Sequence, residues 1–144
     1  MGIFSFLFGG GSRDTDFQSR EMSGATLHID GAGTYDFDIV GEASYQENLE
    51  QIAGPKTEAG HEHECMAVLI PEPDNRYDRN AVRVDINSLT VGYIPKEIAA
   101  AIAGMIARSP AVSRFSVDAI IVGGWRRRNG SEGSFGVKLD MPEE

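Results

Sequence analysis

Alternating apolar and polar side chains predict most of the strands in this chain. In residues 35–40, Tyr35, Phe37 and Ile39 alternate with Asp36, Asp38 and Val40, a pattern typical of a half-buried strand. Further strands are predicted from apolar or alternating runs at 62–70, 81–86, 89–94, 114–122 and 135–141. The polar pair Asn87 and Ser88 separates two of these runs, so it predicts a tight β-hairpin.

Two helices are predicted between these strands. Ser44 and Glu47 have the spacing of a capping box, in which each side chain accepts a backbone amide at a helix start. That short helix ends before Gly54. A second helix begins at Pro95, carries apolar residues at three- and four-residue spacing, and ends at Pro110.

This order of elements predicts a small, mainly β domain of the α+β class whose sheet curls into a barrel. We expect the domain to span residues 33–144. Residues 1–32 are expected to form a flexible N-terminal tail, because the glycine triplet 9–11 disfavours regular structure. The apolar run 3–8 is too short to cross a bilayer, so no membrane is expected as a partner, and a protein partner is the alternative for this tail.

Charge is distributed unevenly along the 144 residues. The net charge is −9, yet residues 1–74 hold 14 acidic and 3 basic residues, whereas residues 75–144 hold 8 acidic and 10 basic ones. The second half could therefore carry a basic surface that meets an anionic partner, and the alternative, which composition alone favours, is that its bases are scattered over a solvated surface. Cys65 is the single cysteine, which excludes an internal disulfide and favours a reducing, cytoplasmic location.

No pattern of residues predicts catalysis or a cofactor. The nucleophile elbow, the phosphate-loop lysine motif and the zinc-protease helix are all absent from the sequence. His61, His63 and Cys65 would share one face of a strand and form a weak candidate zinc site. A plain strand start that leads to a buried thiol is the favoured interpretation.

The segment 71–82 is the densest group of candidate binding residues. After two prolines it presents Tyr77, a ring able to stack on a base, between Arg76 and Arg79, which can meet phosphates. Asp78 can accept a hydrogen bond from a sugar hydroxyl. Alternatively, the Asn and Asp side chains bond their own backbone and only shape the turn.

Three stretches of the chain resemble the HIRAN domain family. PEPDNRYDRNAVRV at 71–84 and TVGYIPKEIA at 90–99 form a doubled motif, and IVGEASYQENL at 39–49 resembles the opening strand of the family and its first helix. The resemblance covers roughly residues 35–141. It implies an OB-like curled β-barrel of about six strands with two helices, and a non-enzymatic module that binds single-stranded DNA at its free 3′ end.

The resemblance also assigns roles to seven residues: Tyr45, Asn75, Tyr77, Asp78, Tyr93, Lys96 and Phe135. Tyr77 would stack on the terminal nucleotide, Asp78 would receive the 3′-hydroxyl and Lys96 would meet a phosphate. Tyr45, Tyr93 and Phe135 would be aromatic members of the site, and Asn75 would support it.

One position departs from the family pattern. The related remodelling ATPases carry an arginine where Ser44 stands, so one phosphate contact is lost. The resemblance implies work in DNA repair or at replication forks. The alternative is a protein-interaction module that kept the fold without strong DNA binding.

Overall fold

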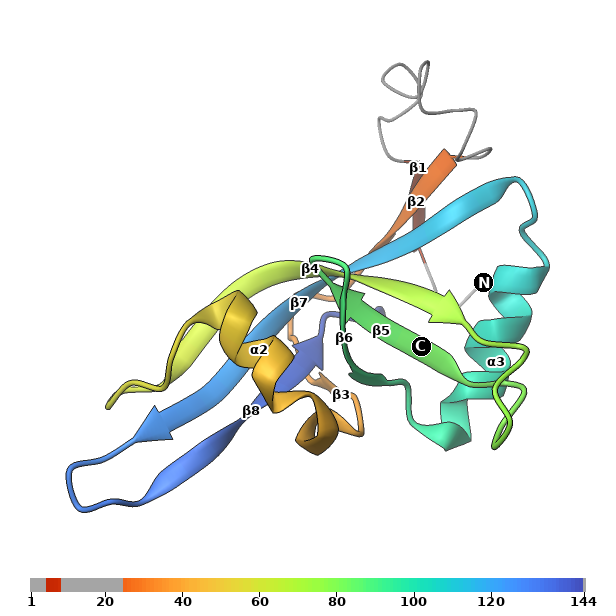
Figure 1. Cartoon of the computed structure of the whole chain (residues 1–144). Coiled ribbons are helices and arrows are strands. Elements are labelled where there is room, and N and C mark those ends of the chain that lie inside the picture. Colours follow the sequence, from red (N-terminus) through yellow and green to blue (C-terminus); the bar gives the residue numbers. More distant parts are fainter. Residues whose placement is uncertain (1–4, 9–24, 144) are drawn as a thin grey trace.

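The computed structural model describes residues 5–8 and 25–143. The described part is mostly β with two α-helices and one short 3₁₀ helix (Figure 1). The strands are β1 (Ser5–Phe8), β2 (Ala25–Asp30), β3 (Phe37–Asp38), β4 (His61–Pro71), β5 (Val82–Ile86), β6 (Leu89–Tyr93), β7 (Val112–Arg126) and β8 (Glu132–Leu139). The helices are η1 (Glu42–Tyr45), α2 (Gln46–Ala53) and α3 (Lys96–Ala107). None of the helices in these ranges is long and apolar enough to cross a membrane.

Six strands curl into a barrel that closes on itself. The antiparallel pairs β6–β5, β5–β4, β4–β7, β7–β8 and β8–β3 form a continuous path. Val40, just past β3, then pairs with β6: its amide donates to the Tyr93 carbonyl at 2.9 Å, and its carbonyl accepts the Tyr93 amide at 2.8 Å. The predicted curled barrel of about six strands with two helices is confirmed.

Local chemistry explains the hairpin and the second helix. Asn87 and Ser88 have φ of 54° and 66°, the left-handed values that suit a two-residue turn between twisted strands. Helix α3 starts directly after Pro95 and buries Ala99, Ile102 and Met105 on one face, as its spacing predicts.

The start of α2 differs from the prediction. The chain enters this helix through the 3₁₀ turn η1, and no side-chain hydrogen bond caps either helix start. The prediction that Ser44 and Glu47 form a capping box is therefore wrong. Gln46 takes over the anchoring, because its side-chain oxygen and nitrogen bond the amide and carbonyl of Phe135 on β8.

Strand β2 corrects the expectation that all of residues 1–32 form a tail. It pairs in parallel with β7, and Leu27 and Ile29 are buried in the core. Past its end, the buried carboxylate of Asp140 accepts the amide of Gly33 at 2.8 Å, so the chain stays attached to the barrel. Residues 1–4 and 9–24, with the glycine triplet, lie outside the described residues.

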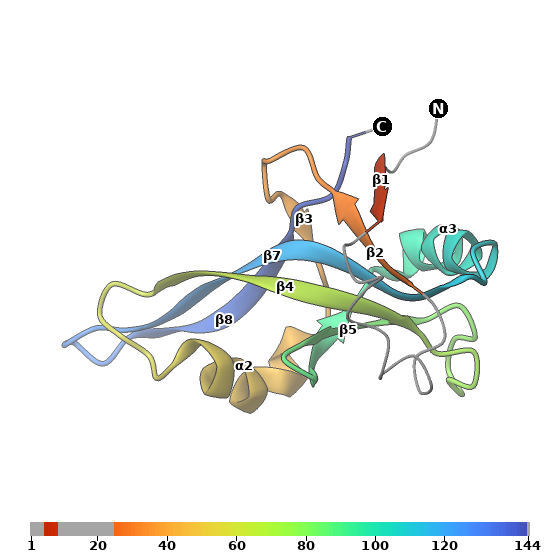
Figure 2. The same cartoon turned by 90° about the horizontal axis from the view of Figure 1, so that it is seen from above.

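Strand β7 runs further than expected and forms a projecting hairpin with β8 (Figures 1 and 2). Gly123 and Gly124 bend it with φ of 78° and 68°, values that side chains rarely allow. A Cβ on Gly124 would also collide with the ring of Phe135. The bend carries Trp125 and three arginines away from the barrel.

Candidate nucleic-acid interface

Asn75 organises the turn between β4 and β5. Its side-chain oxygen accepts the amides of Tyr77 and Asp78 at 2.8 and 3.0 Å. Asp78 repeats the arrangement, since one of its carboxylate oxygens accepts the amide of Asn80 at 2.9 Å. The expected self-bonding of this turn is therefore present. It fixes the backbone but leaves the Tyr77 side chain free.

Tyr77 is the most exposed large apolar side chain of the described residues, with 88% of its surface accessible. Its neighbours Arg76 and Arg79 are exposed as well, and neither forms an ion pair within the described part of the chain. A ring on a fixed turn between two unpaired guanidinium groups suits an anionic ligand that has a flat face.

Glu72 lies at the centre of the hydrogen bonds behind this turn. One carboxylate oxygen accepts Asn75 Nδ2 at 3.0 Å and the Tyr93 hydroxyl at 3.1 Å, and the other accepts Arg83 at 3.0 Å. Burial would raise the pKa of Glu72, but these three donors outweigh it, and the pKa is lowered. The carboxylate is thus kept charged and links the turn to β5 and β6.

Arg83 carries this connection into the barrel wall. Its Nε donates to Asp85 at 2.9 Å, while Thr90 donates to the same carboxylate oxygen at 3.1 Å. Asp85 is only 8% exposed. A buried carboxylate needs such partners, so this polar chain fixes the geometry of the turn against β5 and β6.

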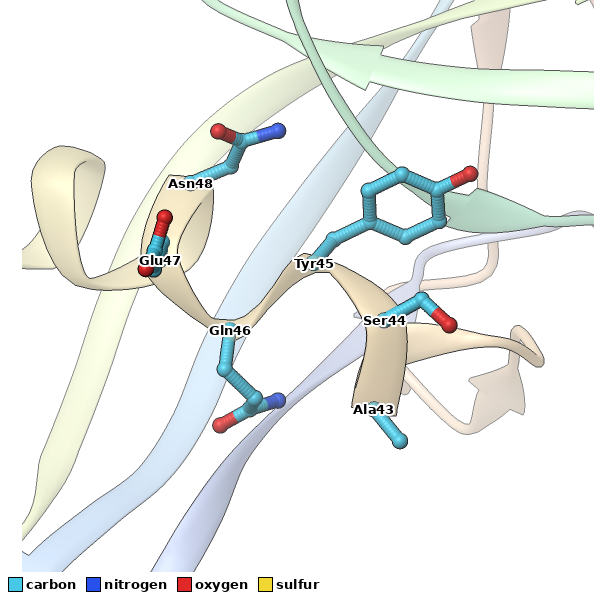
Figure 3. Close-up of a pocket in the computed structure, with 6 residues that line it drawn as sticks. All are labelled: Ala43, Ser44, Tyr45, Gln46, Glu47 and Asn48. Carbon is cyan, nitrogen blue, oxygen red and sulfur yellow. The ribbon is translucent and has the colours of Figure 1, made fainter.

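Tyr93 and Tyr45 meet beside this network. Burial, the hydrogen bond to Glu72 and the nearby Tyr45 phenol raise the pKa of Tyr93 to about 12. The Tyr45 ring points toward β6 (Figure 3), and residues 43–48 line an open cavity of about 410 Å³. Asn48, which also lines it, donates to the Thr90 carbonyl at 2.8 Å.

Lys96 lies at the same end of the barrel as the turn. The amide of Ile94 donates to the carbonyl of Val82, and the amide of Ala81 donates to the carbonyl of Asp78. The segment that leads from β6 into α3 therefore lies beside the end of the β4–β5 turn. Lys96 is exposed at the first position of α3, whose start has no side-chain cap. An ammonium beside uncapped helix amides is a suitable position for a phosphate.

Phe135 does not belong to this group. Its ring is 3% exposed, packs beneath Gly124 and lies 5.2 Å from the His61 ring. The family resemblance assigned it as a stacking ring, but burial leaves no face for a base.

The other six assigned residues lie near one another. Asn75 and Tyr93 meet through Glu72, and Tyr45 adjoins Tyr93. Tyr77 and Asp78 extend from the same turn, and Lys96 lies at its edge.

The cluster at the start of β4 does not form a metal site in the described part of the chain. His61 Nδ1 lies 3.0 Å from the carbonyl of Gly123, while His63 is exposed. Burial raises the pKa of the Cys65 thiol to about 11, so it stays protonated near neutral pH.

Glu72 and Arg83 are the positions that sequence reasoning missed. Both lie inside the quoted motif, but a glutamate after a proline and an arginine on an alternating strand read as solvent-exposed. Only the fold reveals that donors from the turn, β5 and β6 converge on one carboxylate.

Two of three comparisons with known proteins find a match. The family model described as the HIRAN domain matches residues 33–124. Among solved structures, the chain is similar to the crystal structure of the HIRAN domain of human HLTF, with 19% identity over 73% of this chain and 75% of that one and a TM-score of 0.36. A search of curated proteins finds no match. The family model covers well over half of the chain, which therefore belongs to the HIRAN domain family, whose members are generally DNA-binding modules.

Proposed function

We propose that this protein binds single-stranded DNA and recognises its free 3′ end at the turn between β4 and β5. The observation that carries the proposal is Tyr77, an almost fully exposed ring on a turn whose backbone is held by Asn75. An exposed ring on a fixed backbone offers a stacking platform, and an aromatic side chain with only two rotatable bonds loses little conformational entropy when it binds.

The neighbouring groups suit the other parts of a terminal nucleotide. Asp78 uses one carboxylate oxygen within the turn, and its other oxygen has no hydrogen-bond donor among the described residues. That oxygen accepts the 3′-hydroxyl, while Tyr77 stacks on the base. Tyr93 and Tyr45 form the wall of the site, and Asn75 supports it.

The phosphates are met by few cations. Arg76 and Arg79 on the turn and Lys96 at the start of α3 are exposed bases close to the site. Since each contact with single-stranded DNA contributes about 0.7 to the slope of log affinity against log salt, three contacts give a slope near 2. Binding is then dominated by stacking and by the end contact, and it suits a factor that acts where DNA repair or fork processing exposes 3′ ends.

Fluorescence anisotropy with six-nucleotide DNA strands tests the proposal. Strands that end in a 3′-hydroxyl should bind tighter than strands that end in a 3′-phosphate, because a phosphate placed against Asp78 is repelled and donates no hydroxyl proton. Equal affinity for the two strands would refute end recognition. An RNA strand of the same sequence shows whether the 2′-hydroxyl is tolerated.

A further inference from the structure

The tip of the β7–β8 hairpin carries a basic surface that end recognition does not use. Arg126, Arg127 and Arg128 follow Trp125 in sequence, and all three arginines are exposed. A short turn separates them from β8, within which the Arg127 amide bonds the Ser131 carbonyl at 2.8 Å. Three of the 13 basic residues of an acidic chain are thus concentrated on one projection.

Trp125 arranges this surface. The guanidinium carbon of Arg127 lies 4.1 Å from the centroid of the indole ring, a cation–π stack. On Gly133 of the paired strand, a side chain would collide with the indole, so the backbone packs directly against it. The indole therefore positions the Arg127 guanidinium, a planar group on which a nucleic-acid base can stack.

The remaining charges at the tip leave two arginines free. Glu132 accepts hydrogen bonds from Lys56 at 3.0 Å and from Arg126 at 3.2 Å, and these bonds lower the pKa of Glu132. The negative charge of this carboxylate is therefore balanced by its two cationic partners. Arg127 and Arg128 form no ion pair within the described ranges. Beside the indole lies an open hollow of about 570 Å³, with Glu62 as its acidic member.

The tip and the β4–β5 turn lie at opposite ends of the molecule (Figures 1 and 2). The distance between them can be estimated along β4, because His61 at its start pairs with Gly123 near the tip and Pro71 at its end precedes the turn. Ten residue steps along β4 and four more from Gly123 to Arg127, at about 3.3 Å each, give roughly 46 Å. A stacked strand with about 3.4 Å per nucleotide covers this distance with about 14 nucleotides, and an extended strand needs fewer.

We propose that Arg127 and Arg128, beside Trp125, form a second contact for the same single strand, roughly 10 to 14 nucleotides from its 3′ end. This inference rests on the proposed binding of single-stranded DNA. Nucleic acid fits better than an acidic peptide because the tip combines a flat guanidinium plane with a second free cation, which suits a base and its phosphate. The two contacts act together only on strands long enough to reach both.

Affinity for short and long strands tests this inference. Strands of 6 and 20 nucleotides with free 3′ ends are compared on the full chain, with Arg127→Gln/Arg128→Gln as the variant. The matched control, Arg108→Gln/Arg114→Gln, removes two exposed arginines near the C-terminus of α3 and the start of β7. We expect the 20-mer to bind wild type more tightly than the 6-mer, by roughly tenfold or more.

The tip variant should lose that advantage and leave 6-mer binding unchanged, and its salt slope on the 20-mer should fall by about 1.4. The control should keep both affinities. A 20-mer no tighter than the 6-mer, or an equal loss in both double variants, would overturn the second contact. So would poly-glutamate that displaces the 20-mer as well as unlabelled DNA does. Loss of the 3′-end preference on the 6-mer refutes only the proposed end recognition.

Discussion

Removing the ring of Tyr77 should weaken DNA binding without unfolding the protein. The side chain is 88% exposed, so Tyr77→Ala removes almost no buried surface, and we expect a change in unfolding free energy below about 0.5 kcal/mol. Stacking of one base on an aromatic ring contributes about 1–3 kcal/mol, which corresponds to a roughly 5- to 150-fold rise in Kd.

Anisotropy titration with a six-nucleotide strand bearing a free 3′ end measures this loss, and thermal melting confirms that the variant is folded. Tyr77→Phe is the matched control, because it keeps the ring and the turn and should bind within about twofold of wild type. A folded Tyr77→Ala protein with wild-type affinity would refute the claim that this ring is the stacking platform.

Three further predictions concern the framework of the site. Ile29→Ala should cost about 2–5 kcal/mol in urea unfolding because the side chain is fully buried, and a cost below 1 kcal/mol would show that β2 is not part of the core. Glu72 has a lowered pKa, so its stabilising effect is present above its ordinary pKa of 4.5 and is lost as the pH falls through the lower, folded value. Thermal melting against pH should show this loss in wild type and not in Glu72→Gln. Burial raises the pKa of the Cys65 thiol from 9.0 to about 11, so at pH 8 this thiol should react with Ellman's reagent far more slowly in the folded protein than in protein unfolded in urea. Equal rates in the two states would contradict its burial.

Features set by neighbouring residues were predictable from the sequence. The turn at Asn87 and Ser88 and the helix after Pro95 depend on local backbone preferences, and both lie where expected. Strand β2 was missed and assigned to the tail, because the run is short and its partner β7 lies more than 80 residues away. A parallel pairing at that separation leaves no local signal.

The site itself was predictable only in part. The self-bonding of Asn75 and Asp78 follows from their known preference for turns, and the structure contains it. The network around Glu72 depends on the β4–β5 turn meeting β5 and β6, which no spacing in the sequence reveals. Phe135 shows the opposite error, because it was assigned to the site but does not belong there. Its ring packs against Gly124 at the bend in β7 and is buried.

The most direct test of the central claim compares Asp78→Asn with wild type on strands that end in a 3′-hydroxyl and in a 3′-phosphate. The amide oxygen keeps the hydrogen bond to Asn80, so the turn is preserved while the charge is removed. We predict that wild type prefers the hydroxyl end by roughly tenfold or more, as expected for a hydrogen bond to a charged group, and that the variant binds both ends nearly equally. An unchanged preference in the variant would contradict recognition of the 3′ end by Asp78.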